Sequence, residues 1–83
     1  KTSIMFSVKD KPGALHKILE HFAKHKINLT KIESRPSKRK AWEYIFFVDM
    51  QGHVEDLKVR KAIDAVKKEC LYLKVLGSYP LAD

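Results

Sequence analysis

Hydrophobic residues recur along this chain at two spacings, and these spacings divide it into six elements. Short runs with the two-residue periodicity or the apolar content of strands predict four strands, at residues 4–8, 27–36, 41–50 and 71–76. Apolar residues three or four apart predict two amphipathic helices, around residues 13–26 and 55–70. The third strand is apolar on both sides, so we expect little water on either of its faces.

The order strand, helix, strand, strand, helix, strand predicts an α+β fold. Right-handed crossovers turn this order into a ferredoxin-like βαββαβ sandwich, in which a four-stranded antiparallel sheet carries both helices on one face. The other face of the sheet is left uncovered within the chain. A length of 83 residues allows one domain, 1–83, whose thin core favours association. Because the apolar pattern starts almost at once after Lys1, we expect a fragment of a longer protein.

Two polar or small residues are candidates for binding a ligand. Before the first helix, Asp10 can accept backbone N–H groups and Pro12 has no N–H to lose. Gly13 follows, and it either makes a tight turn or lets a ligand approach N–H groups at the helix mouth. Asn28 either tolerates an awkward turn or meets the charged end of a zwitterion. These two residues lie at opposite ends of the predicted fold, so they share a ligand only if two subunits meet.

The reactive residues form no catalytic constellation. His21 and His25 are four apart, but no third ligand lies nearby, so we predict no metal site. Cys70 falls on the apolar stripe of the second helix, where a buried thiol is usually inert. Glu33 and Glu43 are candidates for a carboxylate pair across a hairpin, although neighbouring basic residues offer salt bridges instead. We expect neither a cofactor nor catalysis from this chain.

Charge raises one competing class. The chain has 17 Lys and Arg against 10 Asp and Glu, a formal net charge of +7, and RNA-recognition domains share its predicted order of elements. Their motif places Gly after Arg or Lys, whereas Lys40 precedes Ala41, Trp42 and acidic Glu43, so we predict no nucleic-acid partner. No apolar run reaches the length of a membrane span, so no membrane partner is expected. A single cysteine fits a cytoplasmic setting.

Several ordered motifs resemble the ACT domain that binds phenylalanine. They are Gly13-Ala14-Leu15, Ile27-Asn28-Leu29-Thr30, Glu33-Ser34-Arg35-Pro36, Trp42-Glu43-Tyr44 with Phe46-Phe47-Val48-Asp49, and Lys74-Val75-Leu76-Gly77-Ser78-Tyr79-Pro80. The last two look like the version of the domain in prephenate dehydratases. Aromatic amino-acid hydroxylases carry a similar regulatory domain that does not usually close with this terminal run, so the dehydratase version is favoured.

The resemblance implies regulation by phenylalanine. In that family two copies join their sheets side by side, in a dimeric or tetrameric enzyme, and L-phenylalanine between them inhibits its own synthesis. Together with the residues themselves, it gives an expected ligand-binding set of Gly13, Ala14, Leu15, Asn28, Leu29, Ile32, Glu33 and Ser34, with Arg35 and Pro36 shaping the strand end. His16 departs from the aliphatic or aromatic residue that the family often has. The catalytic dehydratase domain, and any chorismate mutase domain, lie outside these 83 residues.

Overall fold

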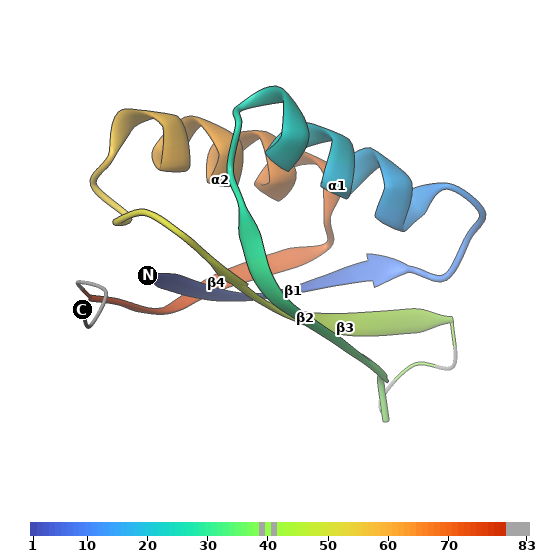
Figure 1. Ribbon diagram of the computed structural model, residues 1–83. Coiled ribbons are helices and arrows are strands. Elements are labelled where there is room, and N and C mark those ends of the chain that lie inside the picture. The colour runs from blue at the N-terminus through green and yellow to red at the C-terminus, as the bar shows by residue number, and fades with distance from the viewer. Residues whose placement is uncertain (39, 41, 80–83) are drawn as a thin grey trace.

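The computed structural model describes residues 1–38, 40 and 42–79. Over these residues the elements are β1 (Thr2–Lys9), α1 (Ala14–Lys24), β2 (Leu29–Pro36), β3 (Glu43–Met50), α2 (Leu57–Glu69) and β4 (Tyr72–Ser78). The strands form one antiparallel sheet in the order β2-β3-β1-β4, and both helices cover the same face of it (Figure 1). The predicted ferredoxin-like βαββαβ sandwich is therefore confirmed.

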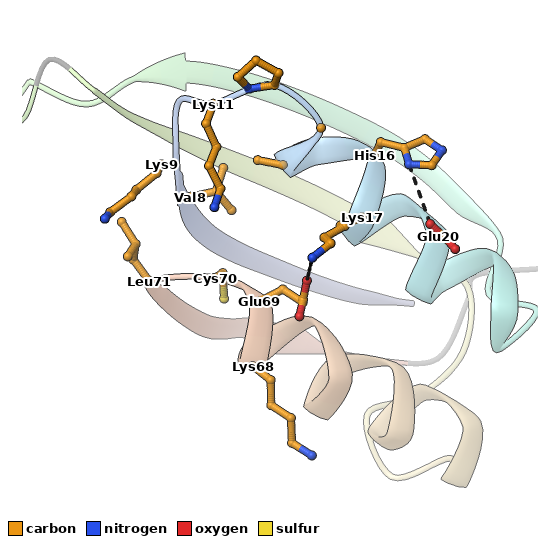
Figure 2. A pocket seen from close by; sticks show the side chains of 13 residues that line it. Val8, Lys9, Lys11, His16, Lys17, Glu20, Lys68, Glu69, Cys70 and Leu71 are labelled. Carbon is orange, nitrogen blue, oxygen red and sulfur yellow. Dashed lines mark ion pairs between the residues drawn. The ribbon is translucent and has the colours of Figure 1, made fainter.

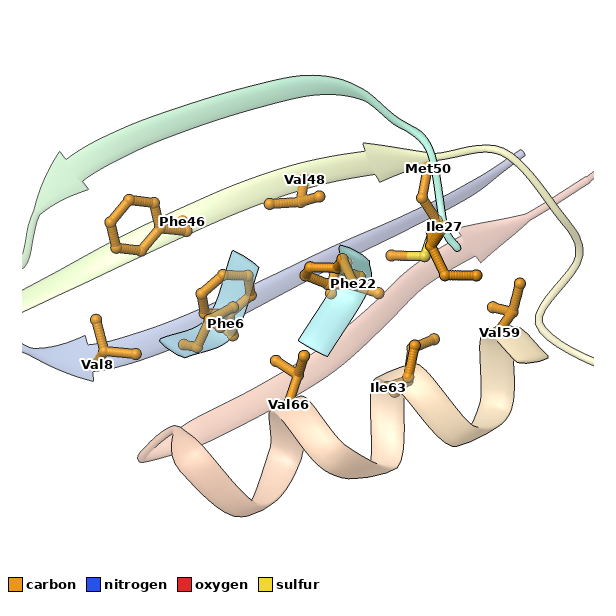
Figure 3. Close-up of a cluster of buried hydrophobic side chains, with 13 residues drawn as sticks. Phe6, Val8, Phe22, Ile27, Phe46, Val48, Met50, Val59, Ile63 and Val66 are labelled. Carbon is orange, nitrogen blue, oxygen red and sulfur yellow. The ribbon is translucent and has the colours of Figure 1, made fainter. Parts of the chain in front are cut away.

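The core lies between the helices and the two central strands, because β1 and β3 turn every second side chain toward α1 and α2. The rings of Phe6 and Phe46 stack with their centroids 5.4 Å apart (Figure 3). The buried apolar residues are Ile4, Phe6, Val8, Ile18, Phe22, Ile27, Phe46, Val48, Met50, Val59, Ala62, Ile63 and Val66. This arrangement leaves β2 and β4 as the edges of the sheet.

The sheet face opposite the helices is uncovered, as predicted (Figure 1). Ile45 and Phe47 of β3 point to this face, where neighbouring strand residues leave them half-buried. The expectation that both faces of this strand avoid water is wrong, because a sheet with one covering layer protects one face. The strand begins at Glu43, and Trp42 before it is 60% exposed; Ala41, which the prediction included, lies outside the described residues.

The other three strands also differ from the prediction by one or two residues at their ends, and β1 spans Thr2–Lys9 rather than residues 4–8. β2 begins at Leu29 rather than residue 27, because the N–H of Ile27 donates to the carbonyl of Phe22 at 2.9 Å and belongs to the end of α1. β4 begins at Tyr72, one residue later than predicted, and continues to Ser78, because its final residue pairs with Thr2 of β1.

The predicted start of the first helix is partly wrong. Asp10 does not cap α1: its backbone N–H donates to the carbonyl of Trp42 at 2.6 Å, and Pro12 lies two residues before the helix. The N-cap residue is Gly13, in the left-handed conformation with φ of +83° and without a side chain to cap the helix. Neither α1 nor α2, the helices of the described residues, is long and apolar enough to cross a membrane.

Candidate functional site

A pocket of about 770 Å³ opens at the end of the sheet where α1 begins and α2 ends (Figure 2). One wall is formed by the end of β1, the turn before α1 and the first turns of α1. The opposite wall is residues Lys68–Leu71, which lead from α2 into β4. We call this the helix-end pocket. Its volume falls within the range of small-molecule binding sites.

The helix-end pocket combines an apolar base with a cationic rim. Val8 is buried, and Ala14 and Cys70 are half-buried, so these three residues supply apolar surface. Four lysines and two glutamates line the pocket, an excess of two positive charges when His16 is neutral. The charged residues are Lys9, Lys11, Lys17, Lys68, Glu20 and Glu69. The arrangement suits a small ligand with one apolar and one anionic end.

Two ion pairs occupy both glutamates of the helix-end pocket. Lys17 Nζ lies 3.8 Å from Glu69 Oε2 and joins α1 to α2 across the pocket (Figure 2). His16 Nδ1 lies 3.7 Å from Glu20 Oε2, one turn farther along α1, and this pair carries two charges only when the histidine is protonated. His16, noted as a departure from the family pattern, is therefore a rim residue of the pocket.

The turn at Gly13 leaves the mouth of α1 accessible. A Cβ built on Gly13 would have no heavy atom within 4 Å, so open space faces this backbone. The N–H of Ala14 donates to the carbonyl of Lys11 at 3.2 Å, and the first helical turn offers further N–H groups that no helical carbonyl can reach. Gly13 and Ala14 line the pocket, whereas Leu15 packs against the core and is not among its lining residues.

The Glu33–Pro36 motif forms the outer half of the edge strand β2. Pro36 ends the strand, and its register through β3 places it level with Val8, at the same end of the sheet as the helix-end pocket. Ile32 and Ser34 pair with core residues of β3 and so lie on the helix side of the sheet. Ile32 is nevertheless 44% exposed there, so this edge of the sheet presents an uncovered apolar side chain.

Arg35 lies on the open face of the sheet. Its Nη2 atom is 4.0 Å from Glu33 Oε2, and its guanidinium carbon is 5.5 Å from the ring centroid of Phe47. Arg35 therefore meets a carboxylate, as predicted, but both side chains are exposed and such pairs stabilise a fold only weakly.

Asn28 and Leu29 lie at the other end of the sheet. Leu29 pairs with Met50 and packs against the core, while the carbonyl of Asn28 accepts the N–H of Gln51 at 3.0 Å. The side chain of Asn28 is exposed. Because the helix mouth lies at the opposite end of β1, Gly13 and Asn28 do not meet within one copy, which confirms the predicted placement.

The other residues considered from the sequence are the carboxylates Glu33 and Glu43 and the histidines His21 and His25. Glu33 is level with Phe47 of β3, four residues from Glu43, so the carboxylate pair across the hairpin is wrong. His25 Nδ1 lies 2.9 Å from the carbonyl oxygen of His21, and no group of three metal-ligating side chains occurs among residues 1–38, 40 and 42–79.

Cys70 is half-buried rather than fully buried, since α2 ends at the residue before it. Burial raises the pKa of the thiol, and its Sγ lies 3.6 Å from the carbonyl oxygen of Lys67. A thiol with a raised pKa stays protonated near neutral pH, which fits the inert role that its position predicted.

One half of the helix-end pocket escaped sequence reasoning. No ligand-binding role was predicted for Lys11, Lys17, Glu69 or Leu71, all of which line the pocket. Spacing along the chain predicts which face of each helix is apolar, but it does not predict which polar residues meet where two helices end side by side.

A model of the ACT domain family matches residues 2–68. The chain belongs to this family. Its curated relatives include the bifunctional chorismate mutase/prephenate dehydratase of Aquifex aeolicus, which is 66% identical over 82 residues, or 99% of this chain and 23% of the relative. The prephenate dehydratase of Methanocaldococcus jannaschii is 44% identical over 84 residues, or 100% of this chain and 30% of that protein. This ACT domain therefore spans less than a third of these relatives.

Solved structures agree with this assignment. The prephenate dehydratase of Arthrobacter aurescens in complex with L-Phe superposes with a TM-score of 0.86 and 37% identity, over 94% of this chain and 26% of that one. GqqA, described as a novel type of quorum quenching acylase, gives a TM-score of 0.92 and 31% identity, over 98% of this chain and 42% of its own. The resemblance of the sequence to the dehydratase version of the ACT domain is confirmed.

Proposed function

We propose that this ACT domain binds L-phenylalanine between two copies of the chain and thereby inhibits a prephenate dehydratase of which it is the regulatory part. The observation that carries the proposal is the open helix mouth at Gly13, beside an apolar base, in a domain whose structural relative was solved with L-Phe. The chain itself catalyses nothing in this account. A cytoplasmic location remains a prediction.

The helix mouth supplies the groups that an amino acid needs at one end. Backbone N–H groups in the first turn of α1 can donate to a carboxylate, and the helix dipole favours a negative charge there. Val8, Ala14 and Leu71 offer apolar surface to the ring, whose burial contributes about 2 kcal/mol. The ammonium group needs acceptors, and in this proposal the Asn28–Leu29 carbonyls of a second copy provide them.

Two features support pairing with a second copy. The proposed contacts of one ligand, at Gly13 and at Asn28, lie at opposite ends of a single copy. The unpaired edge strand β2, which Asn28 directly precedes, also carries an exposed apolar side chain, Ile32. Unpaired strand edges with exposed apolar residues favour association. We propose that two sheets join side by side, as a dimer that can form part of a tetramer.

Substitution of Gly13 tests the ligand site. Gly13→Asn brings a side chain to the helix mouth, and asparagine tolerates the left-handed backbone, so the fold is retained. We expect calorimetric titration with phenylalanine to show at least about a tenfold loss of affinity. Gly13→Val adds a bulkier block together with backbone strain of about 1–2 kcal/mol, and should abolish binding.

Ala23→Asn, on the exposed side of α1, is the matched control and should keep the affinity of the unchanged protein. Circular dichroism establishes that each variant is folded. Folded Gly13→Asn that binds phenylalanine as tightly as the control would place the site elsewhere.

A further inference from the structure

The helix-end pocket is not balanced in charge, and the imbalance is greatest near the turn before α1. Both glutamates that line the pocket lie against basic side chains, Glu69 against Lys17 at 3.8 Å and Glu20 against His16 at 3.7 Å. Among the described residues, Lys11 forms no ion pair, and its side chain points into the pocket toward Val8 (Figure 2). Lys11 is therefore a cation without a counter-charge above an apolar base.

The position of Lys11 matters for how an amino acid would be received. In an amino acid the carboxylate and the ammonium group are attached to the same carbon, so they cannot be far apart. A ligand whose carboxylate meets Lys11 would hold its ammonium group close to the same cation, while Glu20 faces His16 farther along α1. Like charges in such proximity are unfavourable. A single copy of the chain therefore suits the carboxylate end of a ligand and disfavours the ammonium end.

We propose that Lys11 is the carboxylate-recognition residue of the helix-end pocket, and that one copy of the chain binds aromatic carboxylates without an ammonium group, of the arylpropanoate and aryl-2-oxo acid class. The proposal deepens the proposed function, on which its placement of the ligand rests. In this proposal the second copy supplies hydrogen-bond acceptors for the ammonium group of an amino acid. A ligand without an ammonium group therefore does not need the second copy.

The test compares three ligands that share a phenyl ring. 3-Phenylpropanoate keeps the carboxylate alone, phenethylamine keeps the ammonium group alone, and phenylalanine carries both. Calorimetry, with NMR shifts of the amides of Gly13, Ala14 and Leu71, is measured at a protein concentration where sedimentation shows single copies. We expect 3-phenylpropanoate to bind and shift these amides, with an affinity that falls as salt is added, and phenethylamine to leave them unchanged.

Lys11→Met removes the charge and keeps an unbranched side chain. We expect it to weaken 3-phenylpropanoate binding about three- to tenfold, as for removal of one partly exposed charge partner. Lys61→Met, on an exposed part of α2 outside the pocket, is the matched control and should leave affinity unchanged. Equal binding of phenethylamine and 3-phenylpropanoate, or equal affinities of the two variants, would overturn the proposal.

These results are separable from those for the proposed function. If 3-phenylpropanoate binds through Lys11 and phenylalanine does not bind at any concentration of protein, the role of Lys11 stands and regulation by phenylalanine fails. If phenylalanine binds and the Lys11→Met variant is indistinguishable from the Lys61→Met control with both ligands, the role of Lys11 fails and the proposed function stands.

Discussion

At the scale of single residues, Gly52 determines how the loop after β3 fits against α2. Its φ is +107°, and a Cβ there would lie 2.7 Å from Cγ2 of Val59, which is fully buried. The carbonyl of Gly52 accepts a hydrogen bond from Thr2 Oγ1 at 2.7 Å, and Ser78 Oγ lies 2.9 Å from the same hydroxyl. This loop therefore ties β1 and β4 to the start of α2.

Replacement of Gly52 should lower the stability of the fold, because of its positive φ and because of the contact with Val59. We expect Gly52→Ala to lower the free energy of unfolding by about 2 kcal/mol, because the methyl group overlaps a core side chain and the backbone is strained. Urea denaturation measures the loss. Gly77→Ala is the control, because its Cβ would meet Tyr79 at an ordinary 3.6 Å, and we expect a change of about 0.5 kcal/mol or less. Equal losses in the two variants would contradict this account of Gly52.

At the scale of elements, a polar pair links the central strands on the open face of the sheet. Ser3 of β1 is in register with Asp49 of β3, and its hydroxyl donates to Asp49 Oδ1 at 2.6 Å. Lys1 Nζ lies 3.2 Å from Asp49 Oδ2. The hydrogen bond from Ser3, with the hydrogen bond and charge of Lys1, outweighs the opposing effect of burial and lowers the pKa of the Asp49 carboxyl from its ordinary value of 3.8.

The lowered pKa fixes the sign of a pH effect. Because the folded-state pKa of Asp49 lies below the unfolded value, its contribution to stability is present above pH 3.8 and is lost as the pH falls through the folded-state pKa. We expect Ser3→Ala to raise the NMR titration midpoint of Asp49 toward 3.8 and to shrink this contribution. Ser7→Ala, on the same strand and face, should leave the midpoint unmoved. A midpoint unchanged in Ser3→Ala would show that the hydrogen bond does not hold the carboxylate.

The helices and the two central strands were largely predictable because each has one face in the core. The alternating apolar residues from Ile4 to Val8 are the apolar residues that β1 buries. Ile18 and Phe22, four residues apart, are likewise the buried residues of α1. Helix beginnings were harder to predict. The carboxylate of Asp10 is a suitable cap by type, but the backbone N–H of Asp10 pairs with Trp42, and Gly13, with positive φ, takes the N-cap position instead.

Only one wall of the helix-end pocket, the wall at the start of α1, could be predicted from the sequence. Gly13 and Ala14 could be selected because a glycine before an amphipathic helix has few roles, and the resemblance to a family supported them. The other wall, at Glu69 and Leu71, depends on how α1 and α2 lie relative to each other. That relation follows from tertiary packing, which the local pattern of apolar and polar residues does not encode.

At the scale of the whole molecule, the proposed contacts of one ligand lie at the two opposite ends of a single copy. The helix-end pocket and the end of β2 share one end of the sheet, while Asn28 lies at the other end. A thin core and the unpaired edge strand β2, on which Ile32 is exposed, both favour a partner. If phenylalanine needs groups from two copies, binding and association are thermodynamically linked, and each must strengthen the other.

Sedimentation of the unchanged chain across a range of concentrations, with and without phenylalanine, tests directly whether phenylalanine and a second copy bind together. We expect the average mass to rise toward that of two chains as concentration increases, and phenylalanine to move this transition to lower concentration by about tenfold or more. Leucine, added at the same concentration, controls for non-specific effects. A chain that remains a monomer at high micromolar concentration, with phenylalanine as without it, would contradict the account.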